Sequence, residues 1–357
     1  MPLLSSHRSI SALILTTVTT SLTDNMMKTF VLLHLIGHGR WVGAVATLSF
    51  VLPYLILSPL AGSLGDHFPR TRLLQCYKYS ELVAVLLSSI GILTDTIPLM
   101  LSALLAFGVQ ITLISPVKLG LLPDLTSDDH LVTANGLLDG ATFMAILAGT
   151  ALASLLPPIW ICVTMLGMAL IGIGSSLAIR SPSQGNEPIN IHWLSNLRHM
   201  IYVTHHAGKL GVALLLSLFW GVASALVTLI PSFMHHLAQH TALPLSEPHA
   251  ASVLMLSTTL TLGVGALCAG LIPNSRHIST SLFIAMLLAS IGFFCNLSWS
   301  TDLTCLILGG FAAGLCSSQF YAHLIERTQG ETSTISAGNN ILNAIAMSIA
   351  SLLLMLV

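Results

Sequence analysis

The amino-acid sequence predicts an all-α integral membrane protein, built from two repeated halves with about eleven transmembrane helices. Of its 357 residues, 54% are hydrophobic and only 7% are charged. Soluble proteins carry about a quarter charged residues. The second observation is a series of long apolar segments, and the third is an internal sequence match between the halves. Lys and Arg nearly balance Asp and Glu, so no nucleic-acid-binding surface is predicted.

A helix that crosses a membrane needs about 20 largely apolar residues. Six segments meet this criterion before residue 180, and five follow residue 208. They cover residues 10–35, 42–64, 73–93, 97–117, 131–156, 158–179, 209–234, 249–273, 279–297, 302–325 and 335–356. The last helix has no partner that would complete a six-plus-six arrangement. We interpret this as a missing twelfth span, either lost or truncated.

A polar stretch separates the two groups of segments. It holds the turn-rich "SPSQGNEP" and then "INIHWLSNLRHMI", in which apolar residues recur at helical spacing: Ile191, Leu194, Leu197 and Ile201. We predict a short helix lying in the membrane interface. The predicted domains are therefore an N-terminal six-helix half (1–180), a cytoplasmic linker with an interfacial helix (181–208) and a C-terminal half with five helices (209–357).

The distribution of basic residues predicts the orientation. Cytoplasmic loops of membrane proteins carry the excess of Lys and Arg. With the N-terminus inside, almost all of these residues lie at or near one side, and Arg40 alone occupies an opposite loop. We therefore predict a multi-pass protein with a cytoplasmic N-terminus.

An internal match supports two related halves. A shift of 204 residues sets "LVTANGLLD" (131–139) against "ISAGNNILN" (335–343), so that Asn135 aligns with Asn339 and Asp139 with Asn343. Both stretches open the fifth predicted span of their half. Repeated halves with a binding site between them are a common transporter plan.

The loop between spans two and three carries a motif. In "AGSLGDHFPRTRLL" the spacing G-x-L-x-D-x-x-x-R-x-R is made by Gly62, Leu64, Asp66, Arg70 and Arg72. We expect Gly62 to allow a tight turn, and Asp66 to accept hydrogen bonds from a helix N-terminus or to pair with an arginine. The motif resembles the loop of the major facilitator superfamily. That resemblance implies a major-facilitator-type bundle in which this loop gates the two halves. A generic basic cytoplasmic loop is the alternative.

Four further blocks give a narrower resemblance. They are "DN" in span one, "SPVKLGLLPDL" in span four, "ANGLLDGATFMAILAGT" in span five and "AGNNILNAIAM" in span eleven. Together they resemble the lysophospholipid transporter family, including the transporter half of fused transporter–acyltransferase proteins. Two positions depart from that family: Asp139 stands where glutamate is common, and Ser115 where glycine is common.

The resemblance implies transport of a lysophospholipid, such as lysophosphatidylethanolamine, from the outer to the inner leaflet of the bacterial inner membrane by alternating access. The implied partners are a lysophospholipid or another amphipathic small molecule, membrane lipid, and a separate acyltransferase. The chain has no H-x-x-x-x-D pair, the acid–base motif of such acyltransferases, so no enzyme is predicted. Its cysteines lack metal-ligand spacing, and no metal or cofactor is predicted.

Polar residues within the spans are the candidate substrate site, since a charge there usually faces a cavity or a partner. Asp24 and Lys28 lie one turn apart, and either neutralise each other or line a cavity. Lys118 either binds a phosphate or snorkels to the interface, whereas Asp139 lies about 12 Å deep. Glu81 is expected to pair with Lys78 at the interface or to lie on an outer helix. The full set is Asp24, Asn25, Lys28, Lys118, Asn135, Asp139, Asn339, Asn340 and Asn343.

Two other functions remain open at this stage. A proton-coupled exporter of drugs or small metabolites would use Asp24 or Asp139 as its proton carrier. An inactive truncated remnant would account for the missing twelfth span.

Overall fold

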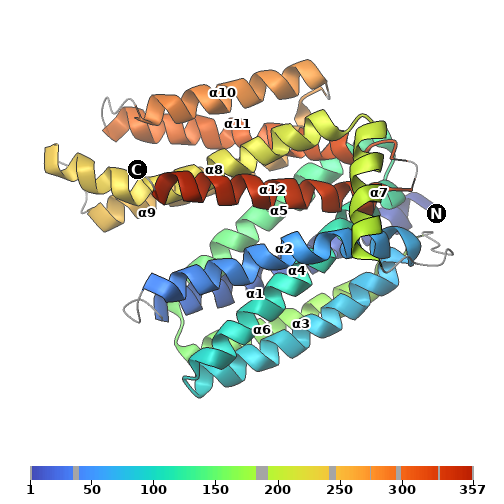
Figure 1. The fold of residues 1–357 in the computed structure, drawn as a ribbon, viewed down its shortest axis with the longest axis horizontal. Helices are drawn as coiled ribbons and strands as arrows, with labels where there is room; N and C mark the ends of the chain where they lie inside the picture. The colour runs from blue at the N-terminus through green and yellow to red at the C-terminus, as the bar shows by residue number, and fades with distance from the viewer. Residues whose placement is uncertain are drawn as a thin grey trace. The chain divides into compact units, whose positions relative to one another are not determined.

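A computed structural model of the protein describes residues 2–34, 40–181, 192–240, 247–273, 275–294, 299–328 and 330–355. Within these ranges the chain forms twelve α-helices and one short 3₁₀ helix (Ala269–Leu271). Figure 1 shows the helices in their order along the chain. The first six helices are α1 (Pro2–His34), α2 (Arg40–His67), α3 (Arg70–Leu93), α4 (Ile97–Leu125), α5 (Asp128–Leu155) and α6 (Pro158–Leu177).

A short helix, α7 (Trp193–His206), follows the six. The last five helices are α8 (Leu210–His240), α9 (Glu247–Cys268), α10 (Arg276–Phe294), α11 (Trp299–Ile325) and α12 (Thr332–Met355). Each apolar segment predicted from the sequence overlaps one of these helices. In the described ranges, seven helices are long and apolar enough to cross a membrane, or eight if α7 and the start of α8 count together.

Proline and turn chemistry set several helix boundaries. The α5–α6 connection contains Pro157 and Pro158, and α6 begins at Pro158. Proline suits the first helical position, because the N–H group that it lacks would have no partner there. Proline also disfavours the helical conformation in the residue before it. The α3–α4 connection is a tight turn in which Asp95 has a φ of 52°. Aspartate tolerates this left-handed conformation better than most residues.

The chain folds into two compact units. Unit 1 comprises Met1–Asp128, Ala145–Leu210 and Ile325–Ile341, and unit 2 comprises Asp129–Met144, Gly211–Leu324 and Leu342–Val357. Two helices are divided between the units. The first part of α5 belongs to unit 2, and the first part of α12 belongs to unit 1. The repeat aligns residues 131–139, all in the unit 2 part of α5, with residues 335–343, of which 335–341 are in the unit 1 part of α12.

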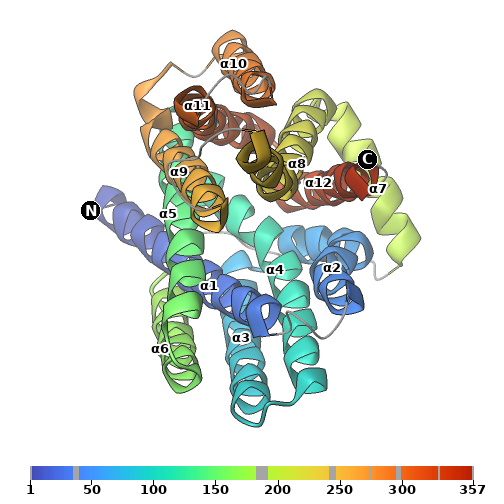
Figure 2. The ribbon, with the colours of Figure 1, turned by 90° about the vertical axis from the view of Figure 1, so that its left-hand side faces the viewer.

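In unit 1, α3 packs against α4 and α6, α2 packs against α4, and α1 packs against α6. Figures 1 and 2 show these helices side by side. Their apolar core includes Met26, Met27, Leu104, Phe107 and Met165, all fully buried. Burial of such side chains stabilises each by about 1.5–3 kcal/mol relative to exposure in water.

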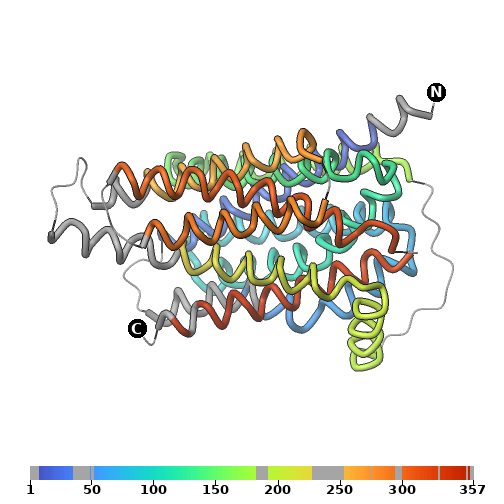
Figure 3. Tube along the Cα trace, turned by 90° about the horizontal axis from the view of Figure 1, so that it is seen from above, coloured from blue at the N-terminus to red at the C-terminus, as the bar shows by residue number. Residues whose placement is uncertain are grey.

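Helix α7 belongs to unit 1 and lies across the direction of α2 (Figure 3). The Trp193 indole donates a hydrogen bond of 2.6 Å to the Ile56 carbonyl of α2. The buried face of α7 carries Asn196, Met200 and Thr204. Leu194 and Ile201, from the pattern that predicted an interfacial helix, are more than half exposed, and Ile191 of the same pattern lies outside the described residues.

Unit 2 is held by close approaches between helix backbones. A side chain on Gly265 of α9 would collide with the backbone of α11 at Phe311, and one on Gly314 of α11 would collide with α9 at Leu262. Small residues at these crossings allow backbones to approach, which is the usual packing of membrane helices.

Candidate functional site

A cluster of charges lies where α2 ends and α3 begins, and we call it the latch: Asp66, Arg70 and Asp124, all in unit 1. The Arg70 guanidinium donates to Asp66 Oδ1 at 2.7 Å, and to the two carboxylate oxygens of Asp124 at 3.0 and 2.9 Å. It also donates from Nε to the Gly65 carbonyl at 2.9 Å. The side chains of Arg70 and Asp66 are only 7% and 5% exposed. Such charge-assisted pairs are the strong hydrogen bonds of proteins.

The latch also binds the start of α12. Asp66 accepts hydrogen bonds from the backbone N–H groups of Ser333 (2.9 Å) and Thr334 (2.7 Å). These N–H groups lack partners within their own helix, and the helix dipole favours a carboxylate beside them. Asp66 therefore makes both contacts expected from the sequence: it accepts hydrogen bonds from a helix N-terminus, and it pairs with an arginine.

The expectation that Gly62 allows a tight turn was wrong. Gly62 lies inside α2, which continues to His67. A side chain at Gly62 would collide with Thr334 and Ala337, and one at Gly65 would collide with Ser333. The glycines therefore let α12 approach α2. Of the other motif residues, Leu64 is half-buried and Arg72 is exposed.

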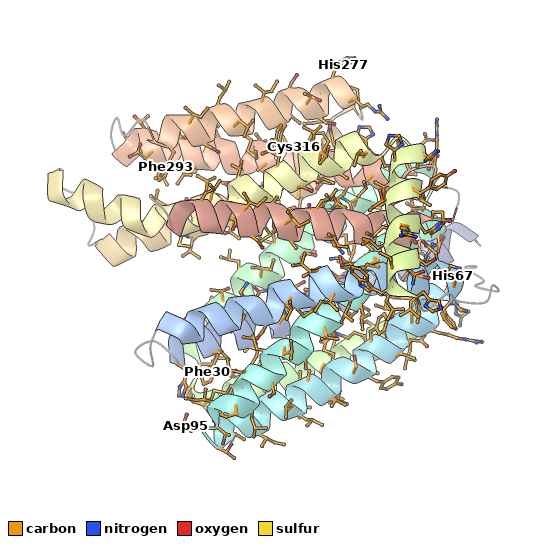
Figure 4. All side chains as sticks on the ribbon, viewed as in Figure 1. Phe30, His67, Asp95, His277, Phe293 and Cys316 are labelled. Carbon is orange, nitrogen blue, oxygen red and sulfur yellow. The ribbon has the colours of Figure 1, made fainter. Side chains whose placement is uncertain are left out.

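Sequence reasoning missed three participants of this region: Asp124, Ser333 and Thr334. Asp124 stood in a block quoted only for its resemblance. The "ETSTIS" stretch from Glu331 to Ser336 carries the Ser/Thr pattern of a helix start. Figure 4 marks His67 at this end of unit 1, with Asp95 at the opposite end.

A second buried group of charges, the Glu81 cluster, consists of Glu81, Lys78, Thr20, Thr23 and Gln110. Glu81 Oε2 accepts from Lys78 Nζ at 2.7 Å, from the Gln110 amide at 2.6 Å and from Thr20 at 2.9 Å. Its other oxygen accepts from Thr23 at 3.2 Å. The Lys78 and Glu81 side chains are both 0% exposed. Removing one member would leave the other charge buried and unpaired.

The Glu81 cluster corrects the expectation for Glu81. We expected it to pair with Lys78 at the interface or to lie on an outer helix, but the pair is at the centre of four helices. Lys78 also donates to Thr19 at 3.3 Å and to Thr20 at 3.0 Å. Gly172 of α6 provides the space, because a side chain there would meet Lys78 and Thr19. In the sequence, Lys78 and Glu81 form an ordinary i, i+3 ion pair on one face of α3. Only the packing of α1, α4 and α6 shows that this face is buried.

Asp24, Asn25 and Lys28 lie on α1 next to this cluster. Asp24 is 5% exposed, and its Oδ1 has no hydrogen-bond partner among the described residues. It lies one turn beyond Thr20 and directly after Thr23, both of which bond Glu81. Asn25 donates to the Ser21 carbonyl at 2.8 Å, whereas Lys28 is exposed. The predicted charge pair therefore consists of a buried carboxylate and an exposed amine one turn further along α1.

The first part of α12 places two predicted amides in unit 1. Asn339 is fully buried, and neither its Nδ2 nor its Oδ1 has a partner among the described residues. Asn340 donates to Ser115 Oγ of α4 at 3.1 Å. Lys118, on the same helix as Ser115, is half-buried.

The remaining three predicted residues lie in unit 2. Asn135 donates to Asp139 Oδ2 at 2.9 Å and to the Ser318 carbonyl at 3.1 Å. The Ser318 hydroxyl also donates to Asp139 at 3.3 Å. Asn343 accepts from Ser217 at 3.0 Å. In the described ranges, no group of three His, Cys, Asp or Glu side chains is arranged to hold a metal ion.

Comparisons with known proteins show which family has this arrangement. The family description "Major Facilitator Superfamily" matches residues 9–351. A protein named Lysophospholipid transporter LplT, from Pectobacterium carotovorum, is 28% identical over 282 residues, which is 74% of this chain and 65% of that protein. The chain therefore spans less than two thirds of that relative's length.

Two solved structures share the fold over nearly the whole chain. The human organic anion transporter MFSD10 matches with a TM-score of 0.72 at 15% identity, covering 98% of this chain and 92% of the other. The transporter FucP, in its outward conformation, matches with a TM-score of 0.73 at 12% identity, covering 98% and 91%.

Proposed function

The chain belongs to the Major Facilitator Superfamily, and from this premise we propose that it is a lysophospholipid flippase. It is a multi-pass membrane transporter and not an enzyme. One observation carries the substrate class: the similarity over 282 residues to a lysophospholipid transporter. The family blocks in α1, α4, α5 and α12 support the same class.

The proposed arrangement has eleven spans, six in residues 1–180 and five in residues 209–357, joined by a cytoplasmic linker at 181–208. The N-terminus is cytoplasmic, and the membrane is the bacterial inner membrane. Lysophospholipid such as lysophosphatidylethanolamine moves from the outer to the inner leaflet by alternating access. A separate acyltransferase then uses the delivered lipid.

The proposed roles follow from charge. A lysophosphatidylethanolamine headgroup has an ammonium and a phosphate, so the Asp24 carboxylate suits the first, and Lys28 and Lys118 suit the second. Asn25 and the amides of α5 and α12 supply neutral hydrogen bonds to the headgroup. Asp139 supplies a further acid. The latch, which includes the motif residues Asp66 and Arg70, has a gating role, because it binds the N-terminus of α12.

The test is uptake of labelled lysophosphatidylethanolamine by spheroplasts and by liposomes that contain the purified protein. We expect uptake above that of empty vesicles, and loss of most of it in Asp24→Asn, which removes the buried charge while keeping the side-chain shape. Cys76→Ser, at an exposed position of α3, is the matched control. Uptake equal to that of empty vesicles would exclude the flippase.

A proton-coupled exporter of drugs or small metabolites is the second candidate. The buried Asp24, with one oxygen that has no partner in the described residues, favours it, because an intramembrane acid is a common proton carrier. Drug resistance that Asp24→Asn abolishes, without any change in lysophospholipid uptake, would support the exporter over the flippase.

A further inference from the structure

Helix α7 has stripes of side chains along its length, and one of them is buried in unit 1. The buried stripe carries Asn196, Met200 and Thr204. A second stripe, which we call the outer stripe, repeats at intervals of four, three and four residues, so that its members share one side of the helix. All of them are exposed: Leu194, Arg198, Ile201 and His205. The outer stripe therefore places a cation between two exposed apolar side chains.

The direction of α7 suits a helix that lies along the membrane surface. It crosses α2, one of the proposed spans (Figures 1 and 3), and the hydrogen bond from Trp193 to Ile56 fixes it there. Trp193 and Tyr202 are both exposed, and these two residue types are enriched where a membrane meets water. A surface helix of this kind places its apolar side chains among acyl chains and its basic side chains among headgroups.

The charges of α7 favour an anionic headgroup. The helix contains Arg198 and three histidines, and its sequence has no Asp or Glu. Anionic lipids of the cytoplasmic leaflet attract basic residues near the surface, and a guanidinium binds a phosphate through two parallel N–H groups. Phosphatidylglycerol has a phosphate without an ammonium group beside it, so its whole negative charge is available to Arg198.

Other sides of α7 contact the first turns of α12, in the same unit. A side chain on Gly338 of α12 would approach Met200 to 3.1 Å, so the two helices touch there. His199 pairs with Glu331 at 3.2 Å. Glu331 lies two residues before Ser333, whose N–H group binds Asp66 of the latch. The start of α12 is therefore contacted both by the latch and by α7.

We propose that the outer stripe binds an anionic phospholipid of the cytoplasmic leaflet, with the phosphate on Arg198 and the acyl chains against Leu194 and Ile201. Because α7 also contacts α12, a lipid that holds α7 in place keeps the α12 N-terminus on the latch. The bound lipid thus stabilises the latched state. This site depends on the cytoplasmic placement of residues 181–208 in the proposed function, and it is the same for a flippase and for an exporter.

The first experiment is a competition between two lipids. The purified full-length protein is offered an equal mixture of phosphatidylglycerol and phosphatidylcholine, and native mass spectrometry measures which lipid it retains. We expect the wild type to prefer phosphatidylglycerol, and Arg198→Gln to lower the ratio of the two lipids about fivefold, the effect of one basic side chain near an anionic surface. Arg198→Lys should keep most of the preference. Arg276→Gln, the same change at an exposed position of α10, should keep all of it.

Two outcomes of the competition would overturn the proposal. If Arg198→Gln retains the two lipids in the wild-type ratio, the outer stripe is not an anionic lipid site and is left to an acidic protein partner. Inorganic phosphate should not displace the lipid, because it has no acyl chain to contact Leu194 and Ile201. Displacement by inorganic phosphate would identify a general anion site instead.

The second experiment measures the latch. The protein is placed in nanodiscs of phosphatidylcholine, alone or in an equal mixture with phosphatidylglycerol, and hydrogen–deuterium exchange is followed at Ser333 and Thr334, whose N–H groups bind Asp66. We expect phosphatidylglycerol to slow this exchange in the wild type and in Arg276→Gln, and to have no effect in Arg198→Gln. Equal exchange in both nanodiscs for the wild type would overturn the link between the lipid and the latch.

Neither experiment measures lysophospholipid uptake. If the protein transports no lysophospholipid, the flippase fails while both results still decide the lipid site. If both results are negative, the lipid site fails while the uptake assay still decides the flippase.

Discussion

The start of α12 in unit 1 and the start of α5 in unit 2 are related by the repeat, yet they are held by different interactions. In unit 1, Asp66 binds the N–H groups of α12 and pairs with Arg70. The 204-residue shift sets Asp66 opposite Gly270. There the helix backbone approaches Thr133 of α5 so closely that a side chain would collide with it.

The same contrast extends into the helix packing. The shift sets Lys78 and Glu81, which are fully buried in unit 1, opposite Leu282 and Ala285 in unit 2. At these two positions unit 1 carries buried charges, whereas unit 2 carries the half-buried Leu282 and the exposed Ala285. When helices separate, the charged groups of the latch can form hydrogen bonds with water instead. The close contact of Gly270 with Thr133 gains no new partner from water. We therefore expect the latch to open during transport.

The strongest test of this comparison is Asp66→Ala. The change leaves Arg70 buried with Asp124 alone, and removes the acceptor of two N–H groups of α12. Breaking a buried pair in this way costs about 3–5 kcal/mol. We expect that loss in the free energy of unfolding in detergent, together with loss of most transport.

The control for this variant is Asp128→Ala. Asp128 pairs with Arg327 at 3.7 Å, and both side chains are largely exposed. An exposed pair contributes about 0–1 kcal/mol. If Asp66→Ala is no more harmful than Asp128→Ala, the latch does not hold α12.

A second test concerns the Glu81 cluster. Lys78→Met leaves Glu81 charged and buried, and we expect a loss of about 3–5 kcal/mol in the free energy of unfolding. The double variant Lys78→Met with Glu81→Gln removes both charges and keeps a polar group beside Thr20 and Gln110. It should recover most of that loss. The measurement is thermal unfolding of the single and double variants in detergent. A double variant as unstable as the single one would contradict the idea that the loss comes from leaving Glu81 unpaired.

The smallest expected effect is in unit 2. Gly270→Val would force apart α5 and the end of the α9 region, and overpacking of this kind costs about 1–3 kcal/mol. Gly174→Ala in α6 is the matched control, because nothing lies within 4 Å of a side chain there. Alanine in place of glycine in a helix is favourable by about 1 kcal/mol. Equal unfolding temperatures for the two variants would contradict the close contact at Gly270.

Most of the fold followed from local patterns. Long apolar segments predict helices wherever they occur, since backbone groups in lipid must be paired within the segment. The resemblance to the major facilitator superfamily agreed with the family match over residues 9–351. The 204-residue repeat aligns residues 131–139, which lie in unit 2, with residues 335–343, most of which lie in unit 1.

The candidate site was less predictable. Asp24 and Lys28 lie one turn apart on α1, yet Asp24 is buried and Lys28 is exposed, because burial depends on which other helices cover each turn. We assigned Gly62 to a turn because glycine is common in turns, whereas in the structure it allows α12 to pack closely against α2. The Glu81 cluster joins α1, α3 and α4, and no local pattern records which helices surround a given side chain.

The sequence by itself determined the helical class, the approximate helix boundaries, the family and the charged loop, because these depend on hydrophobic length and on spacing within one segment. The tertiary structure decided which charges are buried together and which residue of the loop binds α12. Those features depend on contacts between segments up to 268 residues apart, and such contacts form only when the helices pack.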